Sequence, residues 1–573
     1  MVLSTLSLKL ITVAAISVSL FPAAMSASDF DWSKLTPSEK LIWTPCYSGF
    51  ECSRLIVPLD YALAATGTAA IAVTRYPSSS KSDYRGPVLL NPGGPGGSGV
   101  NYVVEAGPSI STILGSDFDI VGFDPRGVSY STPTVSFFKT DAERALWMPA
   151  YVNPLYPSPN ASSGVLAETR AKGQILGTLA QNRNDHYEYM TTDNIARDML
   201  RITEAFGWEK VQYWGISYGS VLGSTFAALF PDKVGRVVID GVLDMEAWYG
   251  SNLTIEMSNS DDALQSFFDG CSAAGPGGCA FSAPTSAEIA SKLDELSASV
   301  TAQTLPVFTS ISCGVLGYTL LRNFVYNALA DPYDLFPFLG QSLADLANGN
   351  ASTMYSASVL PPFECPVHNS TTPVLPFHEN SFEAAVAISC GDGIPISSSL
   401  EELQEFYEGV QEVTKNFAEF ALYFRTLCSG WKLELRKDRF QGPFGAPNTS
   451  FPLLVIGNTA DPVTPIVGAV KTVEAFPGSV LLTVDSPGHT STAVPSTCVH
   501  EYLRTYFRNG TLPTKGTVCT PDSPIFPAAV NATRIGAKRD VVVDDSQDEL
   551  KRAGRALREA VRRVGGRKFQ VGL

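Results

Sequence analysis

The sequence predicts an α/β protein built on a doubly wound, mostly parallel sheet with an inserted, largely helical segment. Three observations lead to this prediction. Strand-like apolar runs alternate with helical patterns, the alternation stops and later resumes, and a Gly-x-Ser-x-Gly sequence stands between a strand-like and a helical run. With 45% hydrophobic and 17% charged residues among 573, the composition is that of a globular protein, and the chain is long enough to bury a large core.

The amino-terminal residues are typical of a signal peptide. Residues 1–27 hold one lysine, an apolar run broken by Pro22, and the small residues Ala24, Ser26 and Ala27, with cleavage expected after Ser26 or Ala27. A membrane anchor is the alternative interpretation, but the run is short for a bilayer span. We therefore expect a secreted protein with no stable membrane insertion.

The charge and the cysteines fit that expectation. A formal charge of −15 argues against a nucleic-acid partner, which would need a basic face. Ten cysteines can pair fully in an oxidising compartment, and local spacing predicts Cys46–Cys52, Cys271–Cys279 and Cys498–Cys519. The pairing of the remaining four stays open: Cys313, Cys365, Cys390 and Cys428. Seven Asn-x-Ser/Thr sequences would carry glycans if they are used: Asn160, Asn252, Asn350, Asn369, Asn448, Asn509 and Asn531.

The strand-like runs fall into two groups. Six precede residue 245, and a helical pattern over 191–208 separates the fourth from the fifth. The runs are RLIVPLDY, AAIAVTRY, GPVLLN, FDIVGFD, VQYWGIS and RVVIDGV. Two more, FPLLVIGN and GSVLLTVD, flank a helical pattern over 464–476. The stretch between the groups carries long helical patterns, Pro-, Ser- and Gly-rich loops and six cysteines, and we interpret it as a lid inserted into one sheet.

This pattern divides the chain into four parts after the signal peptide. Residues 28–245 and 431–530 form the two pieces of the α/β domain, 246–430 form the helical lid, and 531–573 form a basic tail. The tail begins a helix with a capping box, Ser546 to Glu549, and keeps an apolar stripe beneath a basic face. We interpret the tail as a solvated or removable extension, with surface binding as the alternative. The stripe is Leu550, Ala553, Leu557, Ala560, Val561 and Val564.

The Gly-x-Ser-x-Gly sequence predicts a nucleophile at Ser217. Gly215 and Gly219 flank it because a tight turn from strand to helix leaves no room for neighbouring side chains. Such a turn exposes the hydroxyl above the sheet and places the N–H of Tyr218 at a helix N-terminus, where negative charge is favoured.

A base and an acid should follow this serine. His489, in a Pro-Gly loop after the last strand, stands where an α/β-hydrolase carries its base. The other histidines, His186, His368, His378 and His500, are interpreted as surface or packing residues. Asp461, directly after the strand FPLLVIGN, is the expected acid. Its rivals are Asp240, Asp244 and Asp485.

The glycine-rich loop NPGGPGGSG, residues 91–99, has two interpretations. Gly94, Gly96 and Gly99 spell the Gly-x-Gly-x-x-Gly of a dinucleotide site. That site needs the loop near the first strand and a ribose-binding acid about 20 residues on, but the loop comes late and the nearest strand-end acid is Asp124. We therefore expect the other interpretation, an oxyanion hole made by the N–H groups of Gly94 and Tyr218.

Several segments resemble a known family. NPGGPGGSG and FDPRGVSYS look like the oxyanion loop and Asp-x-Arg-Gly segment of prolyl iminopeptidases, except that Asn91-Pro92 stands where the loop would begin with His-Gly. DPVTP and PGHTS resemble the acid and base segments of the tripeptidyl-aminopeptidase branch, and WTPCYSGFECSRLIVPLDY and CVHEYLRTYFRNGTLPTKGTVC resemble its terminal segments. The resemblance covers about residues 40–522 and implies an α/β-hydrolase with peptidase activity.

These inferences together predict a secreted serine exopeptidase that acts near peptide N-termini through Ser217, His489 and Asp461, with no metal and no organic cofactor. The same machinery would suit a carboxylesterase or lipase, and a non-catalytic binding module is a further alternative. Neither the oligomeric state nor the lid residues that bind substrate follow from the sequence. Five lid carboxylates are candidates for the substrate amine: Glu256, Asp261, Asp262, Glu364 and Glu383.

Overall fold

The structure is a computed structural model that describes residues 30–147, 156–310, 312–359, 380–397, 399–526 and 545–568. The predicted signal peptide and the first part of the basic tail lie outside these ranges. So do six residues named above, Glu364, Cys365, His368, Asn369, His378 and Asn531.

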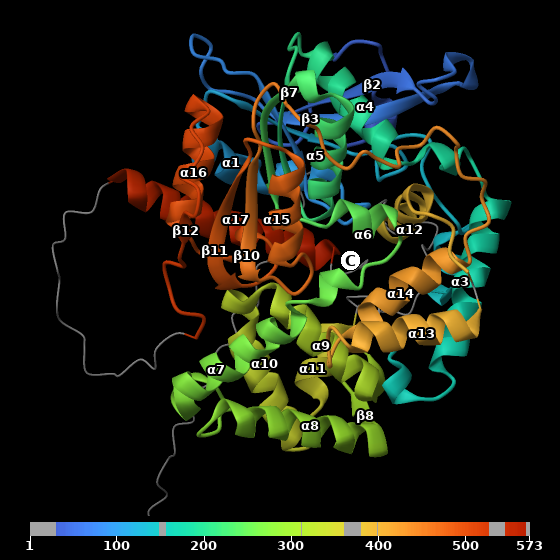
Figure 1. Cartoon of the computed structure of the whole chain (residues 1–573), viewed down its shortest axis with the longest axis vertical. Helices are drawn as coiled ribbons and strands as arrows, with labels where there is room; N and C mark the ends of the chain where they lie inside the picture. Colours follow the sequence, from blue (N-terminus) through green and yellow to red (C-terminus); the bar gives the residue numbers. More distant parts are fainter. Residues whose placement is uncertain are drawn as a thin grey trace, which may run out of the picture.

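A ten-stranded sheet runs through the upper part of the view in Figure 1. Its strands are β1 (Thr44–Pro45), β2 (Glu51–Pro58), β3 (Thr68–Tyr76), β4 (Pro87–Asn91), β5 (Asp119–Phe123), β6 (Val211–Ile216), β7 (Val234–Asp240), β10 (Leu454–Ala460), β11 (Val480–Pro487) and β12 (Val518–Cys519). All eight predicted runs are confirmed as strands. Their order is β1-β2-β3-β5-β4-β6-β7-β10-β11-β12, parallel from β5 onward, whereas β1, β2 and β3 join antiparallel at one edge.

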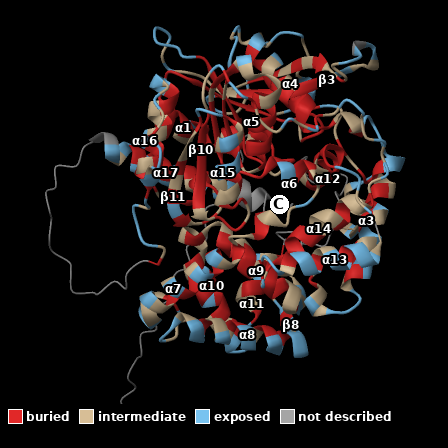
Figure 2. Cartoon of the chain, viewed as in Figure 1, coloured by how far each residue is buried: buried red, intermediate tan, exposed pale blue. Residues whose placement is uncertain are grey.

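Helices cover both faces of this sheet, as a doubly wound sheet requires. On β4, Leu89 packs into the core that holds α4 and α5, whereas Val88 and Leu90 pack into the core that holds α1 and α16. Successive residues of a strand point to opposite faces, so both sides of β4 are apolar and buried. Figure 2 shows α5 and β10 as buried elements. The helices are α1 (Gly99–Leu114), α4 (Thr192–Ala205), α5 (Tyr218–Leu229), α15 (Ile466–Ala475) and α16 (Thr497–Asn509).

Between β7 and its sheet neighbour β10 the chain forms mainly helices. They are α6 (Met245–Tyr249), η6 (Ile255–Met257), α7 (Ser260–Gly278), α8 (Ser286–Ala302), α9 (Tyr318–Ala330), α10 (Pro332–Ala347), α11 (Ser352–Ser358), α12 (Ser381–Asp392), α13 (Leu400–Gln411) and α14 (Ala418–Ser429), with the hairpin β8 (Leu305–Phe308) and β9 (Cys313–Leu316). α7 to α11 gather at the bottom of Figure 1 around a second hydrophobic core, to which α13 and α14 also contribute side chains. α3 (Val165–Asn182) packs on α13 and α14 although it precedes the sheet strands β6 and β7.

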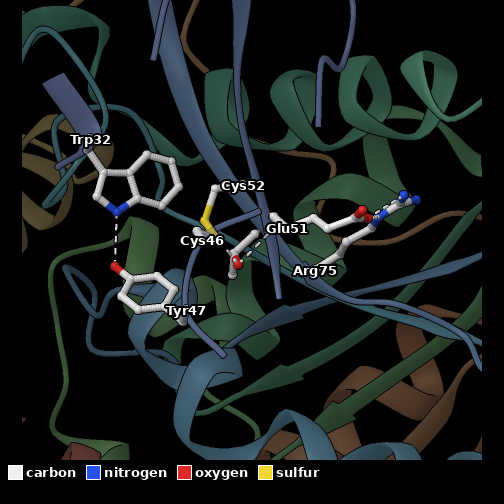
Figure 3. The surroundings of a disulfide bond; sticks show 7 residues. Trp32, Cys46, Tyr47, Glu51, Cys52 and Arg75 are labelled. Carbon is white, nitrogen blue, oxygen red and sulfur yellow. Dashed lines mark hydrogen bonds and ion pairs between the residues drawn. A yellow bond between two sulfur atoms is a disulfide. The ribbon is translucent and has the colours of Figure 1, made fainter. Parts of the chain in front are cut away.

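The three predicted local disulfides are confirmed, and the structure adds a fourth, Cys390–Cys428, between α12 and α14. Cys313 is exposed. Figure 3 shows the surroundings of Cys46–Cys52, where the indole N–H of Trp32 donates to the Tyr47 hydroxyl at 3.0 Å. On β2 the Glu51 carboxylate lies 2.6 Å from the Arg75 guanidinium of β3. The Trp32 contact ties the segment before β1 to the turn between β1 and β2, and the ion pair joins β2 to β3.

The interpretation of the tail as a solvated extension is wrong. α17 (Asp545–Lys568) buries Leu550, Ala553, Leu557 and Ala560 in the core that it shares with α1 and α16. On the same helix, Arg558 and Arg562 lie 3.9 Å and 3.4 Å from the Asp334 carboxylate of α10. The helix therefore contacts both the sheet layer and the helical segment. Its basic composition concealed this role, because half of the buried stripe is alanine.

Leu557 should therefore contribute measurably to stability. Its side chain is 1% exposed, so Leu557→Ala removes buried methyl groups and leaves a cavity. We expect the free energy of unfolding to fall by about 2–5 kcal/mol in urea titrations, with an unchanged m-value. Arg555→Ala, at an exposed position of the same helix, is the matched control and should change it by about 0.5 kcal/mol or less. Equal effects of the two variants would contradict the packing of α17.

Candidate active site

Ser217 stands on the turn that joins β6 to α5. Its φ of 58° and ψ of −124° place a non-glycine residue in a conformation that L-residues rarely adopt, and its N–H donates to the Asp240 carbonyl at 2.9 Å. A Cβ on Gly215 would lie 2.2 Å from the Gly219 carbonyl oxygen, so the turn requires the absence of a side chain there. Tyr218 begins α5, where the first N–H groups have no intrahelical acceptor. The turn thus places the Ser217 hydroxyl beside the first N–H groups of α5, which can act as hydrogen-bond donors.

The glycine-rich loop closes against this turn. Gly93 has a φ of +86°, and a Cβ there would lie 2.4 Å from the Ile216 carbonyl oxygen and 2.8 Å from the Ser217 Cβ. The N–H of Gly93 donates to the Asn91 side-chain carbonyl at 2.9 Å. Gly94 lines the same pocket as Ser217. Asp124 accepts hydrogen bonds from Ser98 and Val100 at the start of α1, so its carboxylate is occupied inside the fold.

Asp461 and His489 lie together beside the end of β10. Nδ1 of His489 is 3.0 Å and 3.1 Å from the two Asp461 carboxylate oxygens. The same carboxylate accepts the N–H groups of Thr464 and Thr490, each at 2.8 Å. Burial raises the pKa of Asp461, but the His489 charge and these hydrogen bonds outweigh it and hold the pKa below its usual value. The carboxylate thus holds Nδ1 of the imidazole and fixes the orientation of the ring.

The rival acids are engaged elsewhere. Asp240 accepts the N–H of Ser491 at 2.8 Å, and burial raises its pKa to about 6. Asp244 caps α6 by accepting the N–H of Glu246 at 2.8 Å and pairs with Lys471. Asp485 is exposed, with a 3.2 Å hydrogen bond from the Thr459 hydroxyl. Of these four aspartates, Asp461 is the one whose carboxylate lies within hydrogen-bond distance of His489.

The remaining described histidines lie away from this group. His186 precedes the turn helix at 187–189 and its side chain is 46% exposed, with Glu188 at 3.9 Å. His500 is buried on α16, where Gly554 of α17 leaves room for its ring, and burial lowers its pKa to about 4. Both therefore fit the surface and packing roles predicted for them.

Gly94, Ser217 and His489 line one pocket, a cavity of about 170 Å³ that we call the Ser217 pocket. Most of its other walls come from helices between β7 and β10. Apolar side chains dominate these walls, including Trp248, Leu253, Met257, Tyr326, Phe420 and Phe424. Within the described ranges no group of three or more His, Cys, Asp or Glu side chains is placed to hold a metal ion.

Sequence reasoning missed the residues that hold the site in place. The Thr464 hydroxyl lies 2.8 Å from the Asp461 carboxylate and 3.1 Å from Nδ1 of His489. The Asn458 amide donates to the carbonyls of Gly488 and Thr490, at 2.7 Å and 2.8 Å, and so joins β10 to the histidine loop. No pattern in a single sequence separates these residues from other strand-end Thr and Asn.

A second missed group supports the serine turn from the helical segment. The buried Asp392 of α12 accepts the N–H of Thr192 at 2.8 Å and the indole N–H of Trp248 at 2.9 Å. The Thr192 hydroxyl in turn lies 2.5 Å from the Tyr218 hydroxyl. Burial raises the pKa of Asp392 to about 7. α12 is thereby linked to the residue that follows Ser217 and to a wall of the Ser217 pocket.

Comparison with known families agrees with the fold. A model described as "alpha/beta hydrolase fold" matches residues 86–265, and one described as "TAP-like protein" matches residues 414–519. The chain is an α/β-hydrolase with a TAP-like segment. In this hydrolase the two matched regions carry Ser217 on one side of the helical segment and Asp461 and His489 on the other.

Three relatives are similar to most of this hydrolase. It is 28% identical to serine protease Hip1 of Mycobacterium tuberculosis over 504 residues, which is 83% of this chain and 90% of the relative. It is 25% identical over 498 residues to tripeptidyl aminopeptidase of Streptomyces coelicolor, with 82% and 83% covered. It is 28% identical over 483 residues to carboxylesterase B of M. tuberculosis, with 82% and 86% covered. The protein is a serine hydrolase similar to these relatives, whose names include both peptidases and an esterase.

Proposed function

We propose that the protein is a serine exopeptidase that hydrolyses short peptides near their N-termini. The observation that carries the proposal is the Ser217 pocket, which Gly94, Ser217 and His489 line together while Asp461 contacts Nδ1 of the His489 ring. Relatives named as a serine protease and a tripeptidyl aminopeptidase support the choice of peptides as substrates.

In the proposed mechanism Ser217 Oγ attacks the scissile carbonyl while His489 takes the hydroxyl proton. The N–H groups of Gly94 and Tyr218 donate to the developing oxyanion. His489 then gives the proton to the leaving amine, which departs and leaves an acyl group on Ser217. A water molecule, deprotonated by His489, attacks this ester and releases the peptide fragment, and the proton returns to Ser217. Asp461 stabilises the imidazolium at each stage.

An esterase is the second candidate, and the apolar walls of the Ser217 pocket favour it. Acyl transfer to a serine does not itself distinguish an ester from an amide. The relative named carboxylesterase B covers this chain as fully as the peptidases do. A panel of matched peptide and ester substrates separates the two candidates by the ratio of their kcat/KM values.

Blocking the substrate amine should sharply reduce cleavage if the protein is an exopeptidase. We expect kcat/KM for a short peptide with a free N-terminus to be at least about tenfold higher than for its N-acetylated form. A site that binds an ammonium group discriminates against an acetylated nitrogen, which carries no charge and leaves the polar groups of the site unpaired. An internally quenched long peptide should be cut only near its N-terminus. Equal cleavage of free and acetylated peptides, or cuts deep in the long one, would contradict the exopeptidase proposal.

We also propose that the protein acts outside the cell. Four disulfides and the signal-peptide pattern of residues 1–27 support this location. Among the described residues, no helix is both long and apolar enough to cross a membrane.

A further inference from the structure

One carboxylate in the Ser217 pocket is left without a complete set of partners. Glu256 lies on the short helix η6, is 2% exposed and lines the pocket together with Ser217 and His489. Its Oε1 accepts the N–H of Asp244 at 2.9 Å. Its Oε2 is buried and has no hydrogen-bond partner among the residues that the structure describes. A buried acceptor without a hydrogen-bond partner costs free energy. We therefore expect a donor from a bound molecule to pair with Oε2.

The other candidate carboxylates inside the described ranges do not line the Ser217 pocket, although Oε2 of Glu383 is likewise buried without a hydrogen-bond partner among the described residues. Glu383 is paired with Arg144 at 2.9 Å and is absent from the lining of the Ser217 pocket. Asp261 accepts the N–H of Lys415 at 2.8 Å, and Asp262, which is exposed, accepts the Asn259 amide at 2.8 Å. Of the candidates inside the described ranges, only Glu256 lines the pocket.

The charges around Glu256 favour the arrival of a cation. Burial raises its pKa well above the usual value; the Asp244 N–H opposes this rise, while the charges of Asp244 and Asp461 add to it. Lys471 lowers the pKa, but its ammonium group is already paired with Asp244. A bound ammonium group would stabilise its ionised form, since charges attract strongly where apolar walls exclude water.

We propose that Glu256 binds the α-ammonium group of the peptide substrate. This inference rests on the proposed exopeptidase function and names the group that recognises the free N-terminus. On binding, Oε2 of Glu256 accepts a hydrogen bond from the ammonium group, and the positive charge favours the ionised form of the carboxyl group. Arg425 also lines the pocket, but its guanidinium donates to the Ser251 carbonyl at 3.0 Å and stacks on Phe406.

The test compares Glu256→Gln with Glu419→Gln. Glu419 is a matched control because it is also a buried glutamate with a raised pKa, yet it is not among the residues that line the Ser217 pocket. For each protein we would measure kcat/KM for a tripeptide p-nitroanilide with a free and with an acetylated N-terminus. Glu256→Gln should lower the free-to-acetylated ratio roughly 10- to 100-fold, the size expected for one charged hydrogen bond. Glu419→Gln should keep the wild-type ratio.

The outcomes separate this inference from the function on which it rests. If the wild-type protein shows no preference for the free peptide, the exopeptidase proposal fails. If the wild-type prefers the free peptide and Glu256→Gln keeps that preference, only the assignment of Glu256 is overturned. Labelling of Ser217 with a fluorophosphonate checks that each variant is folded.

Two further measurements apply if Glu256→Gln does not fold. Glu256→Asp keeps the carboxylate and should retain more of the preference than any neutral variant. In the wild-type protein, the KM for the free peptide should fall as the pH rises toward neutrality, because the ionised carboxylate becomes easier to form, while the KM for the acetylated peptide should not follow this trend. The charged groups around Glu256 that act on its pKa are Asp244, Asp461 and Lys471. Parallel pH profiles for the two peptides would overturn the assignment.

Discussion

Ser217→Ala should abolish turnover of both peptide and ester substrates, by about 10⁴-fold or more in kcat. The substitution removes the attacking oxygen but keeps the Cβ against which Gly93 packs, and alanine experiences the positive φ much as serine does. The fold should therefore survive, as the urea midpoint would report. Steady-state kinetics with titrated enzyme measure the loss.

Ser224→Ala is the matched control for this substitution. Ser224 lies on the same helix, is 1% exposed, and its hydroxyl has no hydrogen-bond partner among the described residues. Removing it should leave kcat within about twofold, since no hydrogen bond is lost. Near-normal activity of Ser217→Ala would remove this residue from the mechanism.

Asp461→Asn should lower kcat by about 10⁴-fold, as loss of the acid does in other serine hydrolases. Both oxygens of the Asp461 carboxylate accept hydrogen bonds, from His489 Nδ1 and from the N–H groups of Thr464 and Thr490. In asparagine one of these oxygens is replaced by an NH₂ group, which donates and cannot accept. The imidazole would then lose its preferred tautomer and its imidazolium form would be less stable. The pH profile and kcat of the purified variant measure this change.

Asp485→Asn tests the same chemistry at a rival position. Asp485 is exposed and accepts a single 3.2 Å hydrogen bond from Thr459, so its charge should matter little to His489. We expect unchanged kcat. If Asp485→Asn were inactive and Asp461→Asn active, the assignment of the acid would be wrong while the fold would stand.

The sequence was informative where one residue type and one local pattern suffice. Ser217 could be placed on its turn because the two flanking glycines leave room for a tight bend from strand to helix. Asp461 was a candidate because it directly follows a strand, and His489 because it stands in the loop after the next strand. The strands themselves were visible because both of their faces are apolar. The antiparallel edge formed by β1, β2 and β3 was not predicted, since alternation along the chain does not report the direction of pairing.

Features that depend on two distant segments could not be predicted. Cys390–Cys428 was one of several pairings open to four cysteines. In the sequence Glu256 resembles the other lid carboxylates, and only the fold leaves its Oε2 buried without a hydrogen-bond partner among the described residues. The packing of α17 depends on the apolar face that α1 and α16 offer, and a stripe of small residues does not reveal such a face.

The adjacency of β7 and β10 has a consequence for biogenesis. Val238 pairs with Leu454, so one long edge of β7 has no sheet partner until the whole helical segment has been made. Pairings so distant in sequence form slowly, because a large loop must close before they contribute. During that interval an apolar strand edge is open to pairing with other chains. Aggregation of the nascent polypeptide thus competes with completion of the sheet, and export in an unfolded state would postpone that competition until all of the strands are present.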